Sequence, residues 1–133
     1  MALRIVAFDF DDTTYPVPLS SDRTLTSTFI PYSFRINAVT VYFPLGCNGK
    51  VKVRVIQTTD NSVPAAGSRP AGENVLAQDN LGSETDVFLS GNDGYETVYL
   101  DREYNEDSVL KAYAVNSDTV AHTCSVKVYV EKI

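Results

Sequence analysis

The chain has 133 residues, of which 44% are hydrophobic and 21% are charged. This length suits one ordinary domain, and 8 Tyr and 6 Phe supply large side chains for a single core. Seventeen Asp and Glu against eleven Lys and Arg give a formal net charge of −6, which repels nucleic-acid phosphates and anionic lipids. We therefore expect one folded domain with no nucleic-acid partner and no membrane partner.

The N-terminal segment, residues 1–21, is predicted to be an extended arm, and residues 22–133 a β-sandwich domain. An apolar run passes into acidic residues and then into Tyr15-Pro16-Val17-Pro18-Leu19, where the prolines favour an extended, unpaired backbone. Acidic residues stand where a signal peptide would be apolar, so we expect synthesis in the cytoplasm. The predicted interface residues of the arm are Leu3, Ile5, Tyr15, Val17 and Leu19.

Within this arm, the stretch from Ile5 to Thr13 resembles the first signature of the haloacid dehalogenase superfamily, an apolar strand followed by Asp-x-Asp-x-Thr. The resemblance implies a phosphatase-like hydrolase in which Asp9 is the nucleophile and Asp11 the general acid and base. That family carries the motif in a doubly wound α/β sheet, and no alternation of strands and helices follows Thr13. We therefore interpret the stretch as a strand that ends in an acidic turn.

Apolar residues recur with a period of two along most of the chain, the spacing of a strand with one buried face. Valines alternate with cations from Lys50 to Val55, directly after Asn48-Gly49, which predicts a hairpin turn. The same alternation returns from Cys124 to Glu131. Strands are predicted near residues 3–8, 24–30, 35–43, 50–55, 74–78, 85–89, 96–101, 109–115 and 124–131.

This pattern predicts an all-β protein, because no window has an apolar stripe at helical spacing. Eight or nine short antiparallel strands must close over one core, and we expect a jelly-roll-like β-sandwich. An immunoglobulin-like sandwich is the alternative, although that fold normally has a core Trp and this chain has none. Residues 58–72, rich in Pro, Gly, Ala and Ser, predict a long loop that is either mobile or held by a partner.

Metal and cofactor sites are not expected. Asp9, Asp11 and Asp12 could offer oxygen ligands to calcium, but the spacing of an EF-hand is absent. Residues 90–96 could likewise cradle a cation, yet their Gly, Asn and Asp are typical of a tight hairpin. A single histidine, His122, excludes every site that needs two imidazoles.

The two cysteines are expected to be free thiols. Cys47 and Cys124 permit one disulfide but do not form the dense framework of small secreted proteins. His122 shares the buried face of the last predicted strand with Cys124, where we expect a core-edge histidine and an inert thiol. No role is assigned to Cys47, which lies in the glycine-containing turn.

Tyrosines offer a second kind of site, because exposed aromatic rings stack on sugars in carbohydrate-binding β-sandwiches. The lack of Trp and the use of aromatic pairs between strands weaken this interpretation. The candidate rings are Tyr95, Tyr99, Tyr104, Tyr113 and Tyr129.

The pattern from Phe29 onward resembles the small all-β decoration, or cement, proteins of tailed-phage heads. The resemblance rests on Phe29 to Ile36 leading into a strand, on the Val-Lys alternation from Lys50, and on the close from Leu110 to Thr123. It implies a non-enzymatic virion protein that binds the assembled shell and stabilises it, with the major capsid protein and its own copies as partners, a homotrimer favoured. A carbohydrate-binding or adhesive module is the first alternative, and the phosphatase-like hydrolase the second.

Overall fold

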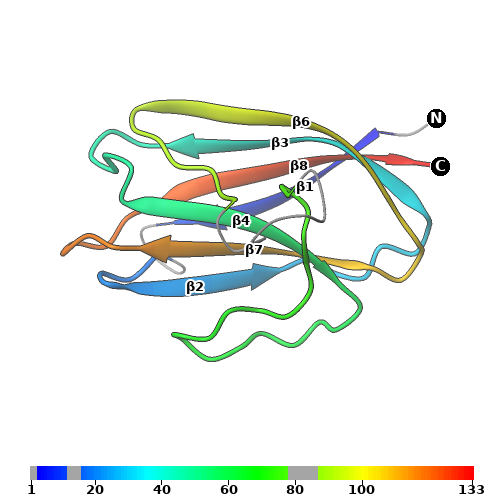
Figure 1. Ribbon diagram of the computed structural model, residues 1–133, viewed down its shortest axis with the longest axis horizontal. Coiled ribbons are helices and arrows are strands. Elements are labelled where there is room, and N and C mark those ends of the chain that lie inside the picture. The colour runs from blue at the N-terminus through cyan, green and yellow to red at the C-terminus, as the bar shows by residue number, and fades with distance from the viewer. Residues whose placement is uncertain (1–2, 12–15, 78–86) are drawn as a thin grey trace.

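The computed structural model describes residues 3–11, 16–77 and 87–133, which form two four-stranded antiparallel sheets (Figure 1). One sheet has the strand order β1-β8-β3-β6, and the other has the order β2-β7-β4-β5. Their core-facing side chains form one hydrophobic cluster between them. The strands are β1 (Leu3–Phe10), β2 (Ser21–Thr26), β3 (Phe34–Phe43), β4 (Val51–Thr58), β5 (Glu73–Asn74), β6 (Gly94–Tyr104), β7 (Val109–Asn116) and β8 (Cys124–Lys132).

The strands pair in a nested order: β1 with β8, β2 with β7, β3 with β6, and β4 with β5. A long antiparallel ribbon that folds over onto itself produces this order, which is that of a jelly roll. The predicted all-β antiparallel sandwich is therefore confirmed. The described residues contain no helix of the length and apolarity needed to cross a membrane.

The core lies between the sheets and uses the alternation seen in the sequence. Val51, Val53 and Val55 of β4 have no exposed surface, while Lys52 between them faces solvent. Fully burying a valine contributes roughly 1.5–3 kcal/mol, so such rows supply much of the driving force for folding. The largest fully buried side chains include Phe10, Phe34, Phe43, Ile30, Ile36, Ile56 and Leu110.

The segment of residues 59–72 covers the outer face of the β2-β7-β4-β5 sheet. Lys111 and Tyr113 alternate with the core residues of β7 and so point outward, yet they are only 2% and 7% exposed. Lys111 Nζ donates a hydrogen bond to the Ser62 carbonyl, and the Gly67 N–H donates to Asp22 Oδ1 at 2.7 Å. The long loop is thus held by its own sheet, an arrangement that the sequence did not predict.

The predicted N-terminal arm is corrected by the strand pairing. Residues Leu3–Phe10 pair along their whole length with β8, and Val6, Phe8 and Phe10 of this strand enter the core. Val17 is fully buried and forms an isolated bridge with His122. Pro16 and Pro18 interrupt strand pairing only after β1 has ended at Phe10. Residues 3–10 therefore belong to the sandwich rather than to an arm outside it.

Two further predicted strands differ from the structure. The run near 74–78 is reduced to the two-residue β5, because turn residues follow Asn74. Most of the run near 85–89 lies outside the described residues, and at its end Leu89 bridges to Val53. β4 therefore has short partners along its outer edge.

Gly72 is predicted to be essential for seating the 59–72 segment. Its φ is +136°, and an added Cβ would collide with the Gln57 carbonyl and lie 2.7 Å from Ile56 Cγ2. We expect Gly72→Ala to lower the free energy of unfolding by roughly 2–4 kcal/mol, measured by urea denaturation. Gly67→Ala is the matched control, because Gly67 also has positive φ but has open space around it. Equal losses in the two variants would contradict this assignment.

Candidate functional site

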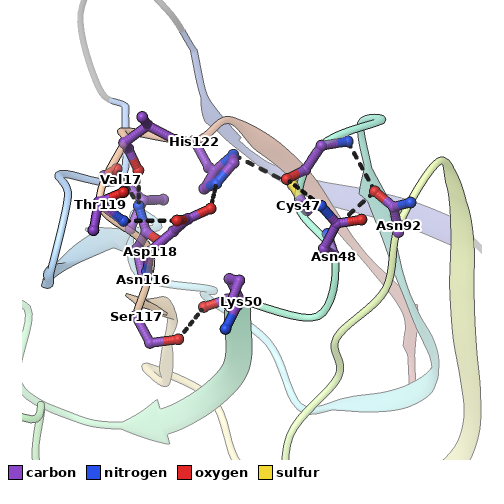
Figure 2. Close-up of polar contacts among 12 residues, drawn as sticks. Val17, Cys47, Asn48, Lys50, Asn92, Asn116, Ser117, Asp118, Thr119 and His122 are labelled. Atoms are coloured by element: carbon purple, nitrogen blue, oxygen red, sulfur yellow. Dashed lines mark hydrogen bonds and ion pairs between the residues drawn. The ribbon is translucent and has the colours of Figure 1, made fainter.

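The clearest cluster of chemically active side chains lies at one end of the sandwich, where the β3–β4 turn meets the β7–β8 connection (Figure 2). His122 Nε2 lies 2.8 Å from Asp118 Oδ2, and His122 Nδ1 lies 3.9 Å from Cys47 Sγ. Figure 2 shows the imidazole between the carboxylate and the thiol. In outline this is a nucleophile, a base and a group that orients the base.

Asparagine side chains build both connections that carry this cluster. Asn116, 1% exposed, donates hydrogen bonds to the Val17 and Val120 carbonyls and accepts one from the Asp118 N–H at 2.9 Å. On the other side, Asn92 Oδ1 accepts from the N–H groups of Gly46 and Asn48 at 2.8 and 3.1 Å. Such side-chain bonds replace regular pairing where the chain turns.

The environment of Cys47 keeps its thiol protonated. The side chain is buried, and burial, followed by the nearby carboxylate of Asp118, raises the pKa of Cys47. Burial raises the pKa of Cys124 to about 12, with a smaller contribution from Cys47. Because the thiolate is the reactive form, the geometry favours a packing role for both cysteines, which are free thiols as predicted.

His122 differs from its predicted setting. Strand β8 begins at Cys124, and the His122 ring bonds to Asp118 and Cys47 rather than lying in the strand beside Cys124. The backbone of His122 bonds to Val17, which ties the chain after β1 to this end of the fold. The cluster therefore joins three separate connections.

We expect both native thiols to react with Ellman's reagent about a hundredfold or more slowly than an exposed cysteine, because reaction requires local opening. Leu45→Cys gives the exposed reference, since Leu45 is 75% exposed in the turn that contains Cys47. In urea all the thiols should react at the same fast rate. Fast labelling of the wild-type protein under native conditions would contradict the packing role.

Acidification is predicted to weaken the cluster through Asp118. The hydrogen bond from His122, and then that from the Thr119 N–H, hold the pKa of Asp118 below its ordinary value of 3.8. A carboxyl with a lowered folded-state pKa stabilises the fold above 3.8 and loses that contribution as the pH falls through its folded-state pKa. The urea midpoint of wild type should therefore be higher than that of Asp118→Asn at pH 6, and the difference between the two midpoints should shrink towards pH 3. A difference that stays constant with pH would contradict this role of Asp118.

The acidic motif of the first strand is not placed as a hydrolase would need. Asp9 lies within β1, opposite Ser125 of the antiparallel strand β8, and Asp11 follows the strand end. Asp12 and Thr13 lie outside the described residues. The motif of the haloacid dehalogenase superfamily follows a parallel strand beside helices, so the likeness stops at the sequence.

A groove of about 750 Å³ runs between the edge strands β1 and β2. Asp9, Asp11, Asp22 and Arg23 line it together with Phe8, Leu25 and the 63–66 segment. Asp22 uses both carboxylate oxygens within the fold, accepting from the Gly67 N–H and, at 2.8 Å, from the Tyr113 hydroxyl. Among the residues that the structure describes, no three His, Cys, Asp or Glu side chains gather as a metal site.

No segment among the described residues covers the outer face of the β1-β8-β3-β6 sheet. Across its four strands, pairing places Ile5 beside Tyr129, Tyr129 beside Ala38, and Ala38 beside Tyr99. We call these four residues the apolar row. Ile5 is 52% and Tyr99 80% exposed, Tyr129 is half-buried, and Ala38 between the two tyrosines is buried.

Other tyrosines and a charge cluster flank the apolar row. The Tyr95 ring, on the same face as Tyr99, lies 4.9 Å from that of Tyr42. Arg35 forms ion pairs with Asp101, Glu103 and Glu131 at 3.0, 3.4 and 3.1 Å. The remaining sugar candidates are placed differently, since Tyr104 packs on Phe34 and Tyr113 lies beneath the 59–72 segment.

The predicted interface residues divide into three groups. Leu3, Ile5 and Leu19 are exposed, Val17 is fully buried and unable to meet a partner, and Tyr15 lies outside the described residues. Tyr99 joins Ile5 on one face, which the sequence did not predict, because only the pairing register reveals it.

No protein-family model and no curated protein matches this chain. Among solved structures, one similar chain comes from infectious bursal disease virus, strain Gx, with a TM-score of 0.41 and 10% identity. It covers 96% of this chain, which spans about a third of that chain (32%). Another comes from tomato aspermy virus, with a TM-score of 0.38 and 12% identity over 98% of this chain and 78% of that one. At these scores neither likeness carries a functional argument.

Proposed function

We propose that this protein is a structural component of a virus particle, and specifically a decoration protein that binds the assembled head of a tailed phage. The observation that carries the proposal is the apolar row, which lies on the broad face that no described segment covers. The pattern resemblance to phage cement proteins supports it, as does the jelly-roll order, which viral capsid and lectin domains use.

The proposed mechanism is thermodynamic. A protein that binds the assembled shell but not its separated subunits stabilises the shell, by about 2.7 kcal/mol per site at a free concentration one hundredfold above Kd. The face combines apolar surface with the Arg35 cluster, in which three carboxylates surround one cation. Its partner surface would therefore present apolar side chains beside basic ones. As a decoration protein, the chain would lie on the outside of the virion.

The proposal predicts that the protein cosediments with assembled heads of the phage that encodes it. Tyr99→Ala should weaken this binding by about tenfold or more, because exposed aromatic residues are common interface anchors. Leu45→Ala, also at an exposed position but in the β3–β4 turn, should bind like wild type. Equal binding by wild type and Tyr99→Ala, or no binding to heads at all, would contradict the proposal.

A carbohydrate-binding module is the second candidate function. Tyr95 and Tyr99 favour it, since both rings lie on β6 and are 67% and 80% exposed. A glycan array separates the two functions: a sugar that binds wild type and is lost in Tyr99→Ala, with no binding to heads, would replace the virion proposal.

A further inference from the structure

The four sheet edges of the described fold are unequal in how they are protected from other strands. Exposed edges normally carry charges, are very short or are covered, because a free edge pairs with other chains. Strand β5 has two residues and β2 has six, so both edges are shorter than β1, which has eight. Strand β6 carries Glu96, Asp101 and Glu103 against one Arg102, a surplus of negative charge that repels a second copy.

Strand β1 is neither short nor net-charged, and no described segment pairs with its outer edge. It has eight residues, and the charges of its one cation, Arg4, and its one anion, Asp9, cancel. The four residues between Arg4 and Asp9 are apolar. One edge of β1 pairs with β8, and the described residues make no strand pairing with the other edge. Its outward side chains Leu3 and Ile5 are 73% and 52% exposed. Backbone donors and acceptors therefore lie beside apolar side chains, the combination that binds an added strand.

We propose that β1 pairs antiparallel with β1 of a second copy of this chain across a two-fold axis. The pairing would join two four-stranded sheets into one continuous sheet of eight strands. A second copy fits this edge because β1 has no net charge, whereas the whole chain, at −6, is otherwise self-repelling. The inference goes beyond the proposed virion role and does not depend on it.

The hydrophobic pattern selects the register of this pairing. In an antiparallel pair, opposite residues share a face, so symmetric registers can centre on Ile5, Val6 or Ala7. Centring on Val6 places Leu3 opposite Asp9, and centring on Ala7 places Ile5 opposite Asp9. Centring on Ile5 instead places Ile5 opposite its own copy and Leu3 opposite Ala7, which keeps the outer face apolar. The apolar row would then run unbroken across both copies.

Cysteine cross-linking tests the pairing and its register together. In this register the two copies of residue 5 have Cα atoms about 4.5–5.5 Å apart, which suits a disulfide. We expect Ile5→Cys to form a covalent dimer under mild oxidation on a non-reducing gel. Wild type should form no covalent dimer, because Cys47 and Cys124 are buried. Leu45→Cys is the control for random collision of exposed thiols, since Leu45 is 75% exposed. Cross-linking of Ile5→Cys no faster than that of Leu45→Cys would overturn the proposal.

Two further variants on the same strand test whether the two-fold axis passes through residue 5. Leu3→Cys and Ala7→Cys should each fail to link with their own copies, which lie about 14 Å apart along the strand. Mixed one to one, they should form a heterodimer, because residue 3 faces residue 7 across the axis. Self-linking of Ala7→Cys as fast as the mixture would overturn this register.

Light scattering measures the assembly without cross-links. Wild type should approach twice the monomer mass of 14.6 kDa as concentration rises. Ile5→Lys should weaken dimerisation at least tenfold, because like charges meet on the axis, and mixing it with Ile5→Glu should restore the dimer. A mass of three copies, or a dimer that Ile5→Lys leaves unchanged, would overturn the two-fold pairing.

Discussion

Burial of alternate side chains between the two sheets is the interaction on which the rest of the structure depends. Val51, Val53 and Val55 of β4 line the same core as Val126, Val128 and Val130 of β8, and all six are fully buried. A shift of one residue in either strand would turn its valines into solvent. This penalty sets the register of the sheets, and the register decides which side chains share the outer faces.

The same constraint explains why the two outer faces differ. On β7, the positions between core residues are Lys111 and Tyr113, and the 59–72 segment supplies carbonyl and amide partners above them. On β1, the positions that alternate with the core residues are Leu3, Ile5, Ala7 and Asp9, and the described chain places no such segment over them. One face is thus completed within the molecule, and the other remains available to a partner.

The fold class was predictable because period-two alternation is a local signal, strongest in the Val-Lys run of β4. The N-terminal boundary was not, since Pro16 and Pro18 suggested an arm although pairing with β8 continues to Phe10. The cluster of Cys47 and His122 was also missed. These residues are 75 positions apart, and only the nested pairing brings their connections together. The sequence instead placed His122 beside Cys124, two residues away, whereas the cysteine that the His122 ring contacts is Cys47.

The covered face gives the molecule a fixed orientation in any assembly that uses the open one. A partner seated on the apolar row would leave the 59–72 segment on the far side, facing the surroundings. Residues 65–68 there are exposed, and the turn at Gly67 has open space around it. A peptide displayed at this turn would therefore project outward from a coated surface, where an antibody could reach it.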